Sequence, residues 1–158
     1  MGDAVIVGAG PAGLVCAMNL AKAGLSAVVL EAETDIPVNL RGSTFHPSSL
    51  DMLERAFGAA TPLIARGLKA PTVQYRRHGE GKIAEFDVAD IADVTDHPFR
   101  VQAEQYKLCQ ILRDMLAEHP NVTPRFGARV SDVAQDEDGV TVTLEDGGET
   151  LRAAYLVG

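Results

Sequence analysis

Apolar and polar residues near the start of the chain are arranged to predict a strand, a helix and a second strand. Residues 4–7 form an uninterrupted apolar run, and residues 25–30, apolar except for Ser26, are typical of a second buried parallel strand. Between these runs apolar residues recur at helical spacing, and Gly24 is expected to end the helix. The inner face of this helix is expected to carry Leu14, Val15, Met18 and Leu20.

The chain leaves this simple alternation between residues 37 and 101, over a length too great and too patterned for a loop. We interpret residues 37–101 as an inserted subregion. A short helix is predicted to begin at Pro47 and to end at Gly58. Residues 72–76 and 82–88 are predicted to form two strands, joined by a hairpin turn at residues 78–81.

After the inserted subregion, residues 103–118 predict an amphipathic helix and residues 122–126 a third parallel strand. From residue 129 a period-two pattern predicts three antiparallel strands, which lead to a final apolar strand at residues 153–157. The expected fold class is α/β: a doubly wound, Rossmann-like parallel sheet with an antiparallel three-stranded excursion and an inserted hairpin. A buried parallel strand is normally followed by a crossover, so we expect residues 1–158 to be one incomplete domain.

Length and charge narrow the class of protein further. The 158 residues suit one domain, and the formal charge of −8 disfavours nucleic acid or an anionic membrane surface as partners. No apolar run reaches the roughly 20 residues of a membrane span, and the first strand begins too soon after Met1 for a secretory leader. Cys16 and Cys109 are expected to be buried, unpaired thiols of a cytoplasmic protein.

The first strand and the helix are joined by a glycine-rich turn, whose residues are candidates for binding a cofactor: Gly8, Ala9, Gly10, Pro11, Ala12 and Gly13. This spacing suits the pyrophosphate of a dinucleotide, because Gly8 permits a tight turn and Gly10 lets the backbone approach the phosphates. Gly13 is expected to bring the helix close to the sheet. The first helical turn offers free N–H groups to the anion, and Pro11 fits there because its missing N–H is not needed.

Glu31 ends the second strand, where a carboxylate can accept hydrogen bonds from ribose hydroxyls. Such a carboxylate would repel a 2′-phosphate, which favours FAD or NAD over NADP. A structural turn that binds no ligand is the alternative interpretation of the glycine pattern.

The other polar clusters predict no metal site. Four aspartates recur every third residue from Asp87 to Asp96, without the glycine and glutamate of a calcium loop, and are expected to form a solvated edge. The four histidines lack ligand spacing and are interpreted as turn and surface residues: His46, His78, His97 and His119.

Over nearly its whole length the chain resembles the group A flavoprotein monooxygenases, the aromatic hydroxylases typified by p-hydroxybenzoate hydroxylase. Residues 8–14 are similar to the FAD fingerprint of that family, with Glu31 at the adenosine ribose. The resemblance implies that Arg41, in the run Arg-Gly-Ser-Thr, contacts FAD near its phosphates. It also implies that Gln102 touches the flavin nucleotide and that the backbone of Val130 meets the adenine.

The function implied by this resemblance is that of the N-terminal FAD-binding part of a monooxygenase. The whole enzyme would use NADH or NADPH as co-substrate and O2 to hydroxylate a small aromatic substrate, and it could form a homo-oligomer. Two further motifs of the family would lie beyond residue 158, and no residue here is nominated as catalytic. The alternatives are a non-catalytic FAD- or NAD-binding module and an NAD-dependent dehydrogenase, for which the antiparallel excursion would be unexpected.

Overall fold

The computed structural model describes residues 2–158, which form two compact units. The first unit contains the described residues up to Asn39 together with Leu108–Gly158, and the second unit is Leu40–Lys107. The boundary between them falls within helix α4 (Gln105–Leu116).

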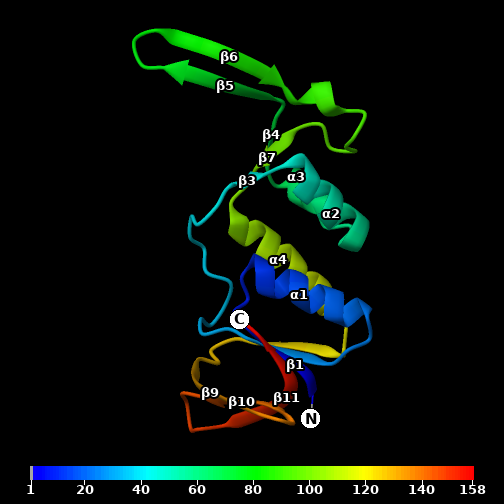
Figure 1. The fold of residues 1–158 in the computed structure, drawn as a ribbon, viewed down its shortest axis with the longest axis vertical. Coiled ribbons are helices and arrows are strands. Elements are labelled where there is room, and N and C mark those ends of the chain that lie inside the picture. Colours follow the sequence, from blue (N-terminus) through cyan, green and yellow to red (C-terminus); the bar gives the residue numbers. More distant parts are fainter. Residues whose placement is uncertain (1) are drawn as a thin grey trace. The chain divides into compact units, whose positions relative to one another are not determined.

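A six-stranded sheet forms the centre of the first unit (Figure 1). In spatial order its strands are β8 (Val122–Arg125), β2 (Ala27–Leu30), β1 (Gly2–Val7), β11 (Thr150–Val157), β10 (Gly139–Leu144) and β9 (Val130–Asp136). The first four strands run parallel, and β10 and β9 extend the sheet antiparallel. The expected α/β class, with a parallel sheet and an antiparallel excursion, is confirmed.

The final strand departs from the sequence expectation. Three antiparallel strands followed by a separate apolar strand were expected. From residue 129 the structure has only two strands, β9 and β10, before β11, and β11 serves as both the third antiparallel strand and the final parallel strand. The first half of β11 pairs antiparallel with β10, and its second half pairs parallel with β1. Ala153 is the junction, because it lies opposite Val140 on one side and Gly2 on the other. An apolar run is compatible with either kind of neighbour, so the pattern alone could not show that one strand has both.

The core of the first unit joins the parallel and antiparallel strands. Side chains from β1, β2, β10 and β11 form one buried cluster with the segment before β9, and its members are Val5, Leu30, Ala128, Val140, Val142, Leu144 and Ala153. In Figure 1 the antiparallel strands lie on the opposite side of the parallel strands from helix α1 (Pro11–Lys22). The parallel strands are therefore covered on both faces, as their apolar sequence requires.

Helix α1 contacts β1, β2 and β8 through one stripe of side chains. The stripe consists of Leu14, Ala17, Met18 and Ala21, which have the i, i+3, i+4, i+7 spacing of a helix face. Two residues expected on this face, Val15 and Leu20, are only half-buried, so that part of the expectation was wrong. The alanines Ala17 and Ala21 lie at the centre of the contact, because a helix that packs closely against a sheet has room there for only small side chains.

The second unit contains a small sheet, a hairpin and two short helices. The sheet has the order β3 (Thr44–Phe45), β7 (Arg100–Gln102), β4 (Leu68–Ala70). The helices are α2 (Pro47–Phe57) and α3 (Ala60–Ala65), the hairpin pairs β5 (Thr72–Arg77) with β6 (Gly81–Asp87), and a 3-10 turn, η1, covers Val88–Ile91. The predicted helix start at Pro47, its end at left-handed Gly58 and the predicted hairpin are confirmed.

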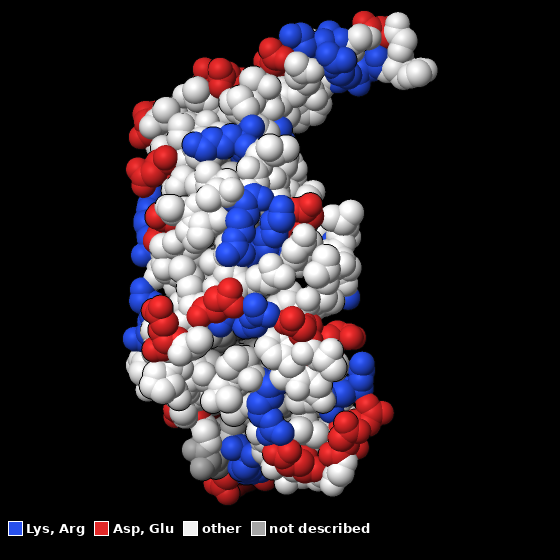
Figure 2. All heavy atoms as spheres, turned by 180° about the vertical axis from the view of Figure 1, so that it is seen from behind, with Lys and Arg blue, Asp and Glu red and all other residues white. Residues whose placement is uncertain are grey.

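Basic side chains gather along the hairpin in Figure 2, where they meet acidic neighbours. Arg77 pairs with Glu80 at 2.9 Å, and Lys82 pairs with Glu85 at 3.3 Å. These pairs are exposed and lie within one turn or strand, so they contribute little to stability and belong to a solvated strand end.

The two cysteines have different surroundings. Cys109 is buried on α4, and burial raises the pKa of its thiol to about 11, which keeps it protonated and unreactive near neutral pH. Cys16 is half-buried rather than buried, contrary to expectation, and both thiols are free. Among residues 2–158, no helix is long and apolar enough to cross a lipid bilayer.

The junction between β1 and α1 generates a prediction about stability. A Cβ on Gly13 would lie 2.0 Å from the carbonyl oxygen of Gly8, whereas a Cβ on Gly10 would have no heavy atom within 4 Å. Replacing Gly13 by Ala should therefore destabilise the fold by about 1–3 kcal/mol, because the clash is with backbone. Gly10→Ala, the matched control, should leave stability close to that of the wild type. Urea unfolding of the two variants tests this, and equal stability would contradict it.

Candidate functional site

The glycine-rich turn between β1 and α1 presents the start of a helix without a side-chain cap. Gly8 adopts a positive φ of 102°, and its N–H donates to the Leu30 carbonyl at 2.7 Å. Gly10 is the extended residue before the helix, and no side chain bonds to the helix start. Pro11 occupies the first turn, as expected. The remaining N–H groups of that turn lack helical acceptors, so they suit an anion from outside the chain.

Glu31 lies directly beside this turn. Its Oε2 accepts a hydrogen bond from the Ala9 N–H at 2.8 Å, and its Oε1 accepts one from the Glu33 N–H at 3.0 Å. The Glu31 backbone is fixed as well, because its N–H donates to Arg125 and its carbonyl accepts from Ala128. A carboxylate can accept further hydrogen bonds on both oxygens, so Glu31 keeps capacity for hydroxyl donors.

Val130 belongs to the same part of the first unit. It begins β9, two residues after Ala128, and packs against the buried cluster of the sheet. The structure thus brings together the turn, the acid and the segment before β9. Backbone donors beside a carboxylate match the needs of an adenosine diphosphate, whose phosphates accept and whose ribose hydroxyls donate. The residues present therefore fit one half of FAD.

Arg41 and Gln102 lie in the second unit. Gln102 is half-buried at the end of β7, and its Oε1 accepts a hydrogen bond from Thr44 Oγ1 at 3.0 Å. Arg41 is exposed and has no ion-pair partner among residues 2–158. A hollow of about 550 Å³ next to Gln102 is lined by Leu40, Ser43, Ala65, Arg66, Gly67, Leu68, Ala103, Glu104 and Lys107.

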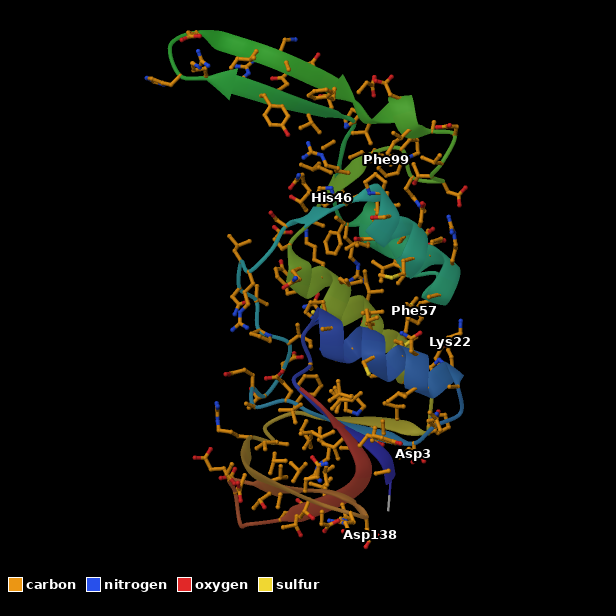
Figure 3. The ribbon with its side chains drawn as sticks, viewed as in Figure 1. Asp3, Lys22, His46, Phe57, Phe99 and Asp138 are labelled. Carbon is orange, nitrogen blue, oxygen red and sulfur yellow. The ribbon has the colours of Figure 1, made fainter. Side chains whose placement is uncertain are left out.

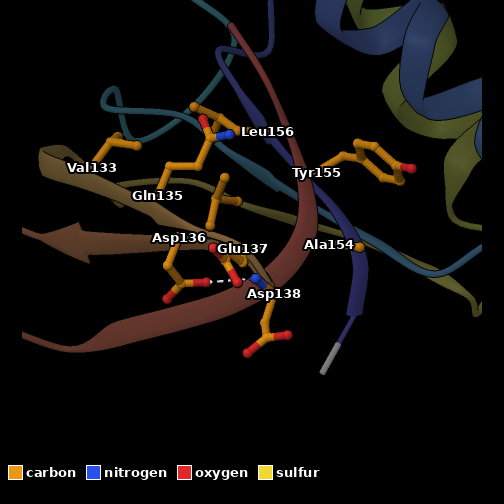
Figure 4. Close-up of a pocket in the computed structure, with 10 residues that line it drawn as sticks. Val133, Gln135, Asp136, Glu137, Asp138, Ala154, Tyr155 and Leu156 are labelled. Atoms are coloured by element: carbon orange, nitrogen blue, oxygen red, sulfur yellow. Dashed lines mark hydrogen bonds between the residues drawn. The ribbon is translucent and has the colours of Figure 1, made fainter.

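A second hollow, of about 490 Å³, lies between the β9–β10 turn and β11 (Figure 4). Its rim carries the carboxylates of Asp136, Glu137 and Asp138, and Asp136 accepts a hydrogen bond from the Asp138 N–H at 2.9 Å. None of its lining residues comes from the glycine-rich turn. A rim of carboxylates repels phosphate, so this hollow does not suit a dinucleotide.

A polar cluster in the second unit was missed by the sequence analysis. Asp51 on α2 is 7% exposed, the one buried charged residue among those described. Its Oδ1 accepts from His97 Nδ1 at 2.7 Å, and its Oδ2 accepts from Thr95 Oγ1 at 2.7 Å. His97, expected at the surface, has a side chain only 13% exposed, which corrects that interpretation. The available signal was an aspartate on the apolar face of a helix, between Leu50 and Leu53.

Phe99, labelled in Figure 3, extends this cluster. Its ring packs edge-on against His97 with 5.9 Å between centroids, and the Lys69 ammonium lies 4.3 Å from the centre of the ring. No three His, Cys, Asp or Glu side chains among the described residues are grouped as metal ligands would be. The cluster is thus held by hydrogen bonds and ring contacts.

The Asp51 carboxylate generates a prediction about acid stability. Hydrogen bonds from His97 and Thr95 hold the pKa of Asp51 below its ordinary value, with a smaller contribution from Arg55 at 3.6 Å. Asp96 also faces the Arg55 guanidinium, and Glu54 also faces the His97 ring. Because the folded pKa is depressed, Asp51 stabilises the fold above the unfolded pKa and loses that contribution as pH falls below about 4.

Asp51→Asn should therefore flatten the decline in stability between pH 6 and pH 3, while Asp93→Asn, at an exposed aspartate, should follow the wild type. Urea midpoints across this range provide the measurement. Parallel curves for Asp51→Asn and the wild type would show that Asp51 titrates alike in both states.

Comparison with known proteins identifies the family of the chain. A family model described as "FAD binding domain" matches residues 1–158. The chain is 36% identical to para-nitrophenol 4-monooxygenase of Pseudomonas sp. (strain WBC-3), over 96% of the chain and 38% of the relative. It is 33% identical to 6-hydroxy-3-succinoylpyridine 3-monooxygenase HspB of Pseudomonas putida (strain DSM 28022 / S16), over 98% and 39% respectively.

Among solved structures, p-nitrophenol 4-monooxygenase PnpA from Pseudomonas putida DLL-E4 superposes with a TM-score of 0.92 at 32% identity. The match covers 99% of this chain and 40% of that one. The chain thus spans about two fifths of the length of these relatives. With the family match across the whole sequence, the chain belongs to the FAD binding domain family.

Proposed function

We propose that this chain is the N-terminal, FAD-binding part of an NADH- or NADPH-dependent monooxygenase that hydroxylates a small aromatic substrate with O2. The observation that carries the proposal is the uncapped helix start beside the Glu31 carboxylate. The relatives add support, since two of those compared are monooxygenases of para-nitrophenol and of a pyridine. Bound flavin would supply the redox chemistry, taking hydride from the nicotinamide and activating O2 for oxygen transfer to the ring.

The residues of the chain would bind and orient the cofactor. The helix start at residues 10–13 would hold the pyrophosphate by its N–H groups, and Glu31 would accept hydrogen bonds from the adenosine ribose. The backbone of Val130 would meet the adenine. Arg41 would contact FAD near the phosphates, where its guanidinium suits a phosphate oxygen pair, and Gln102 would touch the flavin nucleotide.

The organisation of the chain follows the same proposal. Residues 1–158 would be one incomplete FAD-binding domain in which residues 37–101 are an insertion, and the compact second unit, Leu40–Lys107, supports this division. A cytoplasmic location suits the two free thiols and the supply of reduced nicotinamide nucleotides.

The bound nucleotide decides between this function and its alternatives. The protein expressed from its complete coding sequence would be purified, its absorption spectrum recorded, and the nucleotide released by denaturation identified by chromatography. Release of FAD is expected. Release of NAD alone would favour a dehydrogenase, and binding of FAD without aromatic-dependent oxidation of NADH or NADPH would favour a non-catalytic module.

Gly10→Val should abolish FAD binding without unfolding the protein. The added side chain has space in the free protein, because no heavy atom lies within 4 Å of a Cβ at Gly10. It would occupy the position through which the backbone approaches the phosphates. Titration with FAD measures the loss, and Ala23→Val, at the exposed far end of α1, is the control expected to bind normally. Wild-type affinity in Gly10→Val would refute the fingerprint interpretation.

Glu31→Gln should weaken FAD binding by ~1.5–3 kcal/mol, the range for a hydrogen bond to a charged group. The loss should be smaller than that for Gly10→Val, because the amide keeps one acceptor oxygen. Isothermal titration calorimetry measures both affinities. Glu33→Gln, two residues away and exposed, is the matched control, and an equal effect in both variants would remove the ribose role from Glu31.

A further inference from the structure

Three connections in the second unit form a closed circuit of contacts that includes Gln102. Strand β3 pairs with β7, with Thr44 opposite Gln102. His46 joins β3 directly to helix α2. From α2, Asp51 bonds to the segment that leads into β7, which returns the chain to Gln102.

The hydrogen bonds at Asp51 restrict how the segment that leads into β7 can be arranged within this circuit. Each carboxylate oxygen accepts one hydrogen bond at 2.7 Å, from Thr95 and from His97. Thr95 Oγ1 in turn accepts the His97 N–H at 3.1 Å. A carboxylate removed from water is costly unless its oxygens are hydrogen-bonded, so other arrangements of this segment would leave Asp51 unsatisfied. We call Asp51, Thr95 and His97 the Asp51 latch.

The elements around Gln102 are too short to hold it firmly by strand pairing. β3 has 2 residues, and β4 and β7 have 3 each. Two more backbone hydrogen bonds extend this pairing, from the Ala103 N–H to Ser43 at 3.0 Å and from the Gln105 N–H to Gly42 at 2.9 Å. Backbone hydrogen bonds at residues 88–94 run within the segment, as from the Val94 N–H to Ile91, or to Pro71, as from the Val88 N–H, and none of those described reaches α2. The latch attaches the segment to α2 three residues before β7 begins, beside an exposed ion pair between Arg55 and Asp96 at 3.7 Å.

We propose that the Asp51 latch positions Gln102 for FAD: it fixes the entry to β7 and so keeps the Gln102 side chain, bonded to Thr44, in the arrangement that contacts the flavin nucleotide. The proposal rests on the proposed role of Gln102 in FAD binding. Asp51, Thr95 and His97 are therefore positioning residues and do not themselves touch the cofactor.

Because the two units would recognise different parts of FAD, binding of FAD and of ADP can be measured separately to test this proposal. The glycine-rich turn and Glu31 belong to the first unit and would recognise the adenosine diphosphate half of FAD, which ADP also contains. Gln102 and the latch belong to the second unit. Loss of the latch should therefore weaken FAD binding and leave ADP binding unchanged, whereas a general loss of structure would weaken both.

The test uses protein expressed from its complete coding sequence and freed of bound nucleotide, with Kd for FAD and for ADP measured by calorimetry. His97→Phe should raise the Kd for FAD about tenfold, the scale of one lost hydrogen bond near a ligand, with no change for ADP. His97→Asn, whose amide N–H can replace Nδ1–H, should bind FAD with an affinity close to that of the wild type. His78→Phe, in the exposed hairpin turn, should change neither Kd.

Unchanged FAD affinity in folded His97→Phe, or an equal loss for FAD and ADP, would overturn the proposal. If His97→Phe fails to fold, Thr95→Val provides the test, with an expected rise in the FAD Kd of about threefold from one weaker hydrogen bond. An unchanged Kd in Thr95→Val would likewise overturn it. Failure of the wild type to bind FAD would instead refute the proposed function, a result that the latch variants cannot produce.

Discussion

A strand and a helix approach each other so closely at Gly13 that no side chain fits between them. The carbonyl oxygen of Gly8 lies 2.0 Å from the place that a Cβ of residue 13 would occupy, and this lack of a side chain lets the start of α1 pack against the end of β1. This contact fixes where the first helical turn presents its N–H groups. It also places Ala9 within reach of Glu31, whose carboxylate bonds to it from the neighbouring strand. The geometry of the glycine-rich turn and of Glu31 depends on this absence of a side chain.

The two units satisfy their polar groups by opposite means. In the first unit, the helix start leaves backbone donors without protein acceptors, which suits a ligand that arrives from solution. In the second unit, Asp51 is buried and both its oxygens are bonded by side chains of the same unit. An unsatisfied backbone donor can bind an external partner, whereas a satisfied buried carboxylate restricts the chain to a single arrangement.

Local chemistry accounts for what could be predicted from the sequence. The glycine turn, the helix from Pro47 to Gly58 and the hairpin at residues 72–87 each depend on residues close together in the chain. The burial of His97 depends on Asp51, which is 46 residues away, and no periodicity records such a partner. The same limit applies to β11, since an apolar strand does not reveal its neighbours. The roles of Arg41, Gln102 and Val130 rest chiefly on resemblance and stay predictions.

The double pairing of β11 has a consequence for how the protein is made. Of the strands described here, β1 is made before the others and can pair with β2 early, but its other edge is completed only by residues 153–157. Until then an apolar strand edge stays open to other chains, a hazard during vectorial synthesis. Such distant pairing also slows folding, because loop closure precedes any gain from contact. Among the described strands, the one that leads into the glycine-rich turn is thus made before the others and is among the last to be shielded from aggregation.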